Sequence, residues 1–115
     1  MTDLCIQIQP GRAPGLDVDG LCSLCEALAH DTALIRRFAV VRGNPGEDYI
    51  NLMFASDRPR ELWSVLQRQL YGSPAFGGPM QASSMAMCEG ERGWDDYLLL
   101  QHFNPKVPRD AFPSG

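Results

Sequence analysis

Two cysteines near the start of a predicted helix form the part of the sequence that most resembles a chemical site. Cys22 and Cys25 have the Cys-x-x-Cys spacing that redox proteins use for a reactive dithiol and zinc proteins use for two of their ligands. The other cysteines, Cys5 and Cys88, are not spaced as a second pair of this kind. A zinc ribbon, which needs two pairs, is therefore disfavoured by the spacing alone.

The helix that carries this pair favours a structural role for it. Asp17 can cap a helix that runs to about His30, so both thiols lie more than one turn inside it. A redox dithiol instead has its first thiol exposed at the helix N-terminus. Both cysteines also share an apolar stripe with Leu21 and Leu28. Because a buried free cysteine packs as a small hydrophobe, we predict two inaccessible core thiols, with no metal and no cofactor. A thiol redox or metal protein is kept as an alternative, the third after the two hypotheses given below.

No other group of residues forms a recognisable catalytic site. His102 lies near the end of the last predicted strand, where a lone histidine is more often a packing residue than a catalyst with a positioned acid–base partner. Asp95 and Asp96 are adjacent, so in a strand their side chains point to opposite faces. Phosphate-loop, GxSxG and HExxH motifs do not occur in the sequence. We therefore assign no catalytic residue and do not favour an enzyme.

Composition and charge are typical of one soluble domain. Of the 115 residues, 44% are hydrophobic and 21% are charged, which is ordinary for a globular protein. The net charge of −4 disfavours binding to nucleic acid or to an anionic membrane, because both need a basic surface. No apolar run reaches the roughly 18 residues of a membrane span, and the first residues do not resemble a secretory signal. We therefore expect a cytoplasmic protein.

Apolar alternation and turn residues place seven elements along the chain. Strands are expected at 3–9, 34–42, 48–55, 82–89 and 94–103, and helices at 17–30 and 56–72. Turns are expected at 43–47 and 90–93, and a Gly/Pro-rich loop at 73–80. Residues 1–104 would form a single α+β domain, followed by a flexible, proline-containing tail at 105–115.

This element order matches a ferredoxin-like βαββαβ plan with an extra C-terminal strand. Right-handed crossovers would place the first and third strands in the middle of the sheet, the fourth beside the first and the fifth beside the fourth. We therefore predict an α+β fold in which two helices cover one face of a five-stranded antiparallel sheet.

The sheet face away from the helices carries the main functional indication. If the alternate apolar residues of the strand at 48–55 face the helices, then Tyr49, Asn51 and Met53 face away. The last two predicted strands contain the runs MAMC and YLLL, which are apolar on both faces. A sheet with one solvated face alternates more cleanly. We therefore expect part of the second face to be covered by a partner subunit, by the C-terminal tail or by a ligand.

In element order and length, the segment from Asp3 to Phe103 is similar to the dimeric α+β-barrel group. That group includes small cofactor-independent monooxygenases that pair through their sheets. The similarity carries no diagnostic residues, so it implies a fold and a way of pairing but no catalytic positions.

Two further hypotheses follow from the sheet. The first is a cytosolic, non-catalytic binding module that uses the far sheet face to bind another protein or itself, as a homodimer. The second is a small enzyme or ligand-binding protein of the dimeric α+β-barrel type, with a pocket between the sheet and the Gly/Pro-rich loop. The candidate binding residues for these two hypotheses are Tyr49, Asn51, Met53, Phe76, Trp94 and His102.

Overall fold

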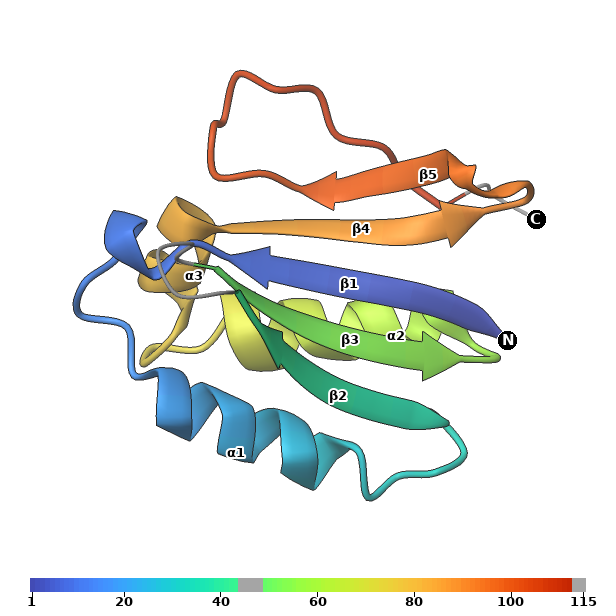
Figure 1. Cartoon of the computed structure of the whole chain (residues 1–115), viewed down its shortest axis with the longest axis horizontal. Helices are drawn as coiled ribbons and strands as arrows, with labels where there is room; N and C mark the ends of the chain where they lie inside the picture. The colour runs from blue at the N-terminus through green and yellow to red at the C-terminus, as the bar shows by residue number, and fades with distance from the viewer. Residues whose placement is uncertain (44–48, 113–115) are drawn as a thin grey trace.

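Five segments with alternating or continuous apolar residues form one antiparallel sheet in the computed structural model, which describes residues 1–43 and 49–112. The strands are β1 (Thr2–Ile8), β2 (Arg37–Arg42), β3 (Ile50–Ser56), β4 (Ser84–Gly90) and β5 (Gly93–Gln101). Their order across the sheet is β2-β3-β1-β4-β5 (Figure 1). The central strand is therefore β1, which pairs with β3 on one side and with β4 on the other.

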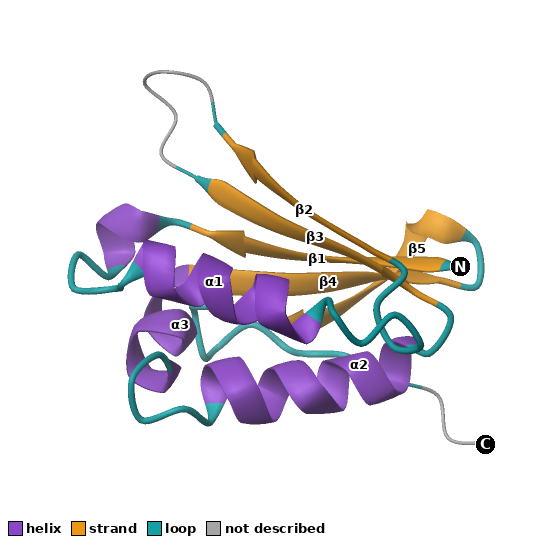
Figure 2. Ribbon diagram, turned by 90° about the horizontal axis from the view of Figure 1, so that it is seen from below, coloured by secondary structure: helices purple, strands orange, loops and turns teal. Residues whose placement is uncertain are grey.

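Three α-helices accompany the sheet: α1 (Val18–Leu28), α2 (Pro59–Leu66) and α3 (Gly77–Ser83). A π-helical turn, η2 (Gln67–Tyr71), continues α2, and a short 3-10 turn, η1 (Pro10–Arg12), follows β1. Figure 2 shows the three α-helices on one side of the sheet. The described residues thus form an α+β domain with a helical side and an opposite side on which only strands lie.

The core lies between the sheet and the helices. Leu4, Ile6 and Ile8 of β1 are fully buried, as the alternation of this segment predicts. Other strands and the helices contribute further buried side chains, among them Leu21, Cys25, Leu52, Phe54, Leu62, Leu66, Leu70, Ala86 and Cys88. Burial of each large apolar side chain stabilises the fold by about 1.5–3 kcal/mol.

The start of α1 is the predicted one. The Asp17 carboxylate accepts a hydrogen bond from the Gly20 N–H group at 3.0 Å, and Asp19 lies in the first turn, where its charge offsets the helix dipole. The helix ends at Leu28, two residues before the predicted end, with Ala29 as its C-cap.

The starts of the second strand and the second helix also differ from the prediction. The second strand begins at Arg37 and not at residue 34, because the N–H groups of Leu34 and Ile35 bond to the Asp31 carbonyl in a turn. The second helix begins at Pro59 and not at residue 56. Its N-cap is Arg58, although Ser56 and Asp57 are the usual capping types.

Residues 77–83 form α3, where a loop was predicted. The glycine and proline residues of this segment predict a loop, yet Gly77 and Pro79 each have a specific place in the helix. A Cβ atom at Gly77 would collide with the Tyr71 carbonyl oxygen, so this approach requires glycine. Pro79 lies in the first turn, where its missing N–H would have no partner within the helix. Strand β4 consequently begins at Ser84 and not at residue 82.

One of the two predicted hairpin turns can be compared with the structure. Between β4 and β5, Gly90 pairs with Gly93, and Gly93 adopts a φ of +75°, a conformation that favours glycine. This turn is confirmed. The turn predicted at 43–47 falls on residues 44–48, which lie outside the described residues.

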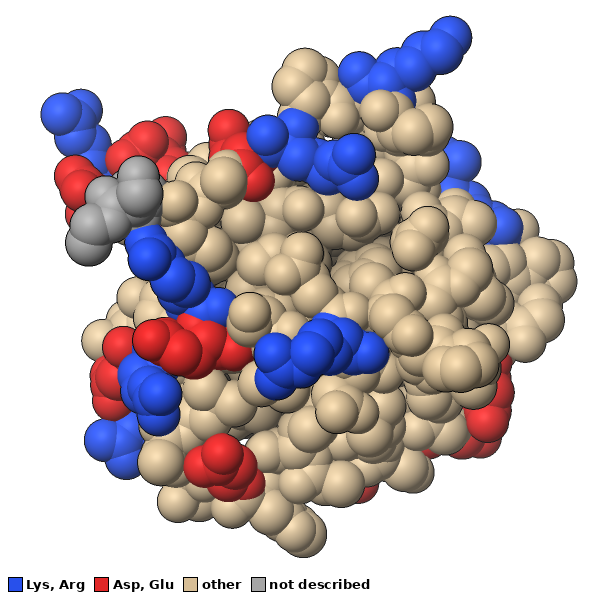
Figure 3. Space-filling model, turned by 180° about the vertical axis from the view of Figure 1, so that it is seen from behind, with Lys and Arg blue, Asp and Glu red and all other residues tan. Residues whose placement is uncertain are grey.

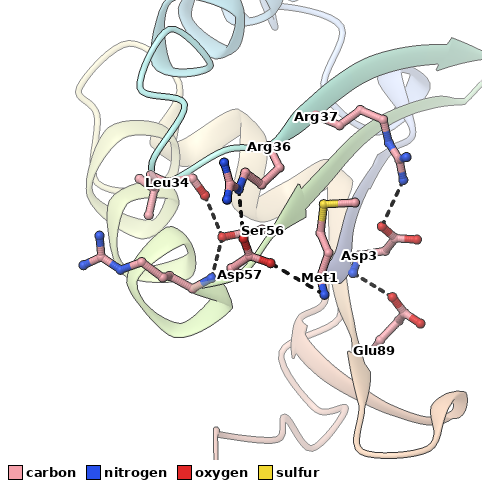
Figure 4. Close-up of polar contacts among 9 residues, drawn as sticks. Met1, Asp3, Leu34, Arg36, Arg37, Ser56, Asp57 and Glu89 are labelled. Carbon is pink, nitrogen blue, oxygen red and sulfur yellow. Dashed lines mark hydrogen bonds and ion pairs between the residues drawn. The ribbon is translucent and has the colours of Figure 1, made fainter.

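A buried serine ties the start of α2 to the end of β3. The Ser56 hydroxyl donates to the Leu34 carbonyl at 2.6 Å and accepts from the Arg58 N–H at 2.9 Å (Figure 4). Next to it, Arg36 Nε donates to the Asp57 carboxylate at 2.8 Å, and this bond lowers the pKa of that carboxyl. Ser56 has no exposed surface, so it links three segments inside the protein.

Replacing this serine should destabilise the fold. The Ser56→Ala variant leaves the Leu34 carbonyl and the Arg58 N–H without their partner, and we expect the free energy of unfolding to fall by about 1–3 kcal/mol. Urea unfolding followed by circular dichroism measures the change. The matched control is Ser64→Ala on the exposed side of α2, which should stay within about 0.5 kcal/mol of the native chain. Equal stabilities of the two variants would contradict the role of Ser56.

Candidate functional site

The sheet face away from the helices, called the open face below, is organised by the pairing register into rows that cross the strands. Residues directly opposite each other in an antiparallel pair have side chains on the same face. The register therefore places one uncharged residue from each strand in a continuous central row. This row consists of Ala39, Met53, Cys5, Met87 and Leu99.

A charged row borders the central row on one side. Arg37 of β2 reaches across Ala55 of β3 to Asp3 of β1, and the guanidinium and carboxylate are 3.4 Å apart (Figure 4). Ala55, the residue between them on β3, is only 1% exposed. The backbone N–H of Asp3 donates to the Glu89 carboxylate at 2.7 Å, which extends the row to β4.

A mixed row borders the central row on the other side. It consists of Val41, Asn51, Gln7 and Met85, again in register. Val41 is 46% exposed. The Asn51 Oδ1 atom is buried and has no hydrogen-bond partner within the described part of the chain. Two amide side chains in the middle of this row are thus flanked by an apolar side chain at each end.

The open face has no helix over it among the described residues, as Figure 1 shows with the strands in front. In the central row Cys5 is 7% exposed, while Met53, Met87 and Leu99 are half-buried. An antiparallel sheet with one solvated face normally carries polar residues on it. An uncharged row across all five strands is instead typical of a surface that contacts another protein.

The predicted binding residues do not form one group. Asn51 and Met53 lie together on the open face. Tyr49 precedes β3 and lines a hollow of about 560 Å³ at the start of α1. Trp94, at the start of β5, is 42% exposed, and Phe76 packs against the core as the N-cap of α3.

His102, the remaining predicted residue, lines a pocket of about 650 Å³ on the helical side. Figure 3 views this side and shows a hollow in mostly uncharged surface, with basic side chains near it. The pocket lies between α2 with η2, α3 and the segment after β5. Trp63, Gln67, Tyr71 and Arg109 also line it. Sequence reasoning missed these four, because it treated residues 56–72 as a regular α-helix and residues 105–115 as a tail.

The four cysteines are not arranged for thiol chemistry. Cys25 and Cys88 are fully buried, and burial raises the pKa of Cys25 to about 12 and the pKa values of Cys5 and Cys88 to about 11. Cys22 was predicted to be inaccessible but is half-buried, and burial raises its pKa as well. The thiolate is the reactive form, so burial disfavours reaction of these thiols at neutral pH. Within residues 1–43 and 49–112, no group of three His, Cys, Asp or Glu side chains could hold a metal ion.

Comparisons with known proteins identify no relative of this chain. No family model matches the chain, and neither a curated protein nor a solved structure matches it significantly. Among the described helices, none is both long enough and apolar enough to cross a membrane. The function must therefore be inferred from the open face and from the pocket.

The raised thiol pKa values predict a loss of stability at alkaline pH. An unfolded thiol ionises near pH 8.5, whereas Cys5, Cys25 and Cys88 keep their protons up to about pH 11 in the folded chain. Above pH 8.5 the unfolded state binds fewer protons than the folded state, so the free energy of unfolding falls as pH rises.

Urea unfolding with a reductant at pH 8 and at pH 10.5 tests this expectation. We expect the native chain to lose at least about 2 kcal/mol between the two pH values. The Cys25→Ala variant lacks one of the contributing thiols, so its loss should be smaller. An unfolding free energy that is the same at both pH values would show that the thiols are not buried.

Proposed function

We propose that this chain is a non-catalytic, cytosolic interaction module that pairs with a second copy of itself through the open face. We also assign its element order to a ferredoxin-like plan, with β5 added beside β4 and α3 inserted before β4. The observation that carries the proposal is the uncharged central row, which crosses all five strands.

The side chains of the central row suit contact with protein. Methionine is flexible and polarisable, and it fits irregular apolar surfaces well. Met53 and Met87 lie on either side of Cys5, the residue of the central strand. Covering these three side chains removes apolar surface from water, which is the main favourable contribution to association.

The size of the open face is sufficient for a specific dimer. With strands about 4.8 Å apart and residues about 3.3 Å apart along each strand, five strands of about seven residues cover about 550 Å². Two such faces bury about 1,100 Å² in total, which exceeds the roughly 1,000 Å² that a biological interface needs. Sheets that pack face to face in this way lie about 10 Å apart.

The charges on the open face favour a second copy as the partner. Arg37 lies on the β2 side of the sheet, whereas Asp3 and Glu89 lie on β1 and β4. A two-fold axis parallel to β1 places the β2 side of one copy over the β4–β5 side of the other. Arg37 of each copy then lies over the β4–β5 side of the other, the side on which Glu89 lies, and the two central rows pack on each other.

This arrangement also predicts which methionines meet. An axis parallel to β1 and passing over it places β3 of one copy over β4 of the other, because these strands flank β1 on opposite sides. Met53 and Met87 are both directly opposite Cys5. Met53 of one copy therefore faces the partner's Met87.

Substitution of this methionine pair by oppositely charged residues tests the proposal. Sedimentation equilibrium should give the native chain a mass of twice its 12.7 kDa. Met53→Arg alone and Met87→Glu alone should each weaken association at least tenfold, because each places an unpaired charge against a methionine of the partner. Mixing the two variants should restore a dimer, since arginine then faces glutamate.

The rescue separates a lost interface from a lost fold, because a misfolded variant would not pair in the mixture. The matched control is Gln69→Glu on the exposed side of η2, which adds a negative charge and should leave the dimer unchanged. A native chain that stays monomeric at about 100 µM, well above the Kd of a stable dimer, would overturn the proposal. So would a mixture of the two methionine variants that remains monomeric.

A further inference from the structure

The pocket on the helical side differs in charge from the chain as a whole. The chain has a net charge of −4, yet Arg109 is the one formally charged side chain among the described residues that line this pocket. No carboxylate lies among them. The other polar lining groups are neutral carboxamides, Gln67, Gln81 and Gln101, together with His102. The local field therefore favours an anion.

The π turn η2 forms the aromatic wall of the pocket. A π turn takes more residues than an α turn, so residue 71 advances less far around the helix axis than it would in a regular α-helix. Tyr71 consequently stays in line with Trp63 and Gln67, and the Trp63 and Tyr71 rings meet edge to face with centroids 5.7 Å apart. Such π turns occur frequently at functional sites.

Internal bonds hold this wall in place. The Tyr71 hydroxyl shares a hydrogen bond of 2.7 Å with the Ser84 hydroxyl, and Ser84 in turn donates to the Met80 carbonyl. Burial raises the pKa of Tyr71, so its hydroxyl stays neutral. The tyrosine therefore offers the pocket an aromatic surface rather than a charge.

The segment that carries Arg109 is held just as firmly. Its neighbour Asp110 accepts from the Leu99 N–H at 2.8 Å and donates its own N–H to the Leu99 carbonyl at 2.7 Å. The Arg12 guanidinium lies over the Phe103 ring, 3.8 Å from the centroid. These contacts close residues 102–109 into a loop whose two ends are both bound to the domain, so the backbone at Arg109 is held beside the pocket.

The Arg109 guanidinium and the His102 ring both have N–H groups that can donate to a ligand. Arg109 Nη1 approaches Gln101 Oε1 at 3.5 Å, and a guanidinium has five N–H donors in a planar fork. His102 Nδ1 accepts from the Asn104 N–H at 2.9 Å, so the neutral ring carries its proton on Nε2. The pocket thus combines one planar cation, hydrogen-bonding amides and an aromatic wall.

We propose that this pocket binds a small aromatic carboxylate, with the carboxylate paired to Arg109 and the ring against Trp63 and Tyr71. A planar carboxylate matches the fork of one arginine, whereas a phosphate dianion would leave charge unpaired in a pocket with a single cation. A volume of about 650 Å³ lies within the range of small-molecule sites. The pocket lies on the helical side, so its occupancy does not depend on pairing through the open face.

Nuclear magnetic resonance titration of the native chain with two matched probes tests this proposal. Benzoate carries the carboxylate, and benzamide is its neutral analogue of the same shape. We expect benzoate to shift the indole signal of Trp63 and the side-chain amides of Gln67 and Gln81, with a Kd of about 1 mM for so small a probe. Benzamide should bind at least tenfold more weakly, because it cannot pair with the guanidinium.

Substitutions of Arg109 distinguish pairing of the carboxylate with the guanidinium from burial of the probe's ring alone. Arg109→Gln should reduce benzoate binding to the level of benzamide. Arg109→Lys, which keeps the charge but not the planar fork, should give an intermediate affinity. The matched control Lys106→Gln removes an exposed charge from the same loop and should leave the preference for benzoate unchanged.

The proposal is overturned by any of three results. These are equal affinities for the two probes, a preference that survives in Arg109→Gln, and shifts that occur away from the pocket or not at all at about 10 mM benzoate, ten times the expected Kd. The amide spectrum of each variant reports its fold in the same experiment. Since association state is measured separately, failure here leaves the proposed dimer untouched.

Discussion

The register of β1 against its two neighbours is the constraint on which the rest of the structure depends. Because successive side chains in a strand point to opposite faces, this register places Leu4, Ile6 and Ile8 under the helices and Cys5 on the open face. A slip of one residue would move every apolar side chain to the wrong face. The buried core therefore fixes the register, and the register in turn aligns the uncharged row across all five strands.

Both proposed sites depend on features that join distant parts of the chain. The central row contains one residue from each strand, so no short motif encodes it. The pocket combines a π turn with a loop that returns to the edge of β5 through Asp110 and Leu99. In our proposals one face contacts a second copy and the opposite side binds a small anion, so the two functions can operate independently.

Local rules predicted the elements whose signals are local. The alternation of β1, the Asp17 cap and the turn before Gly93 follow from neighbouring residues alone. The sequence could not show α3, because its glycine is required by a contact with the Tyr71 carbonyl, which belongs to another element. Arg109 was missed for the same reason, since residues 102–109 have no periodicity and are held by contacts made elsewhere. Of the six predicted binding residues, only Asn51 and Met53 lie together on one surface.

The most direct test of the central claim is an isotope-filtered NOE experiment on a mixed sample, in which half of the chains carry labelled methionine methyl groups. The two-fold arrangement predicts intermolecular NOEs between Met53 of one copy and the partner's Met87, with Leu99 close to the same interface. NOEs only from helical-side residues such as Val65, or no intermolecular NOEs in a concentrated sample, would contradict pairing through the open face.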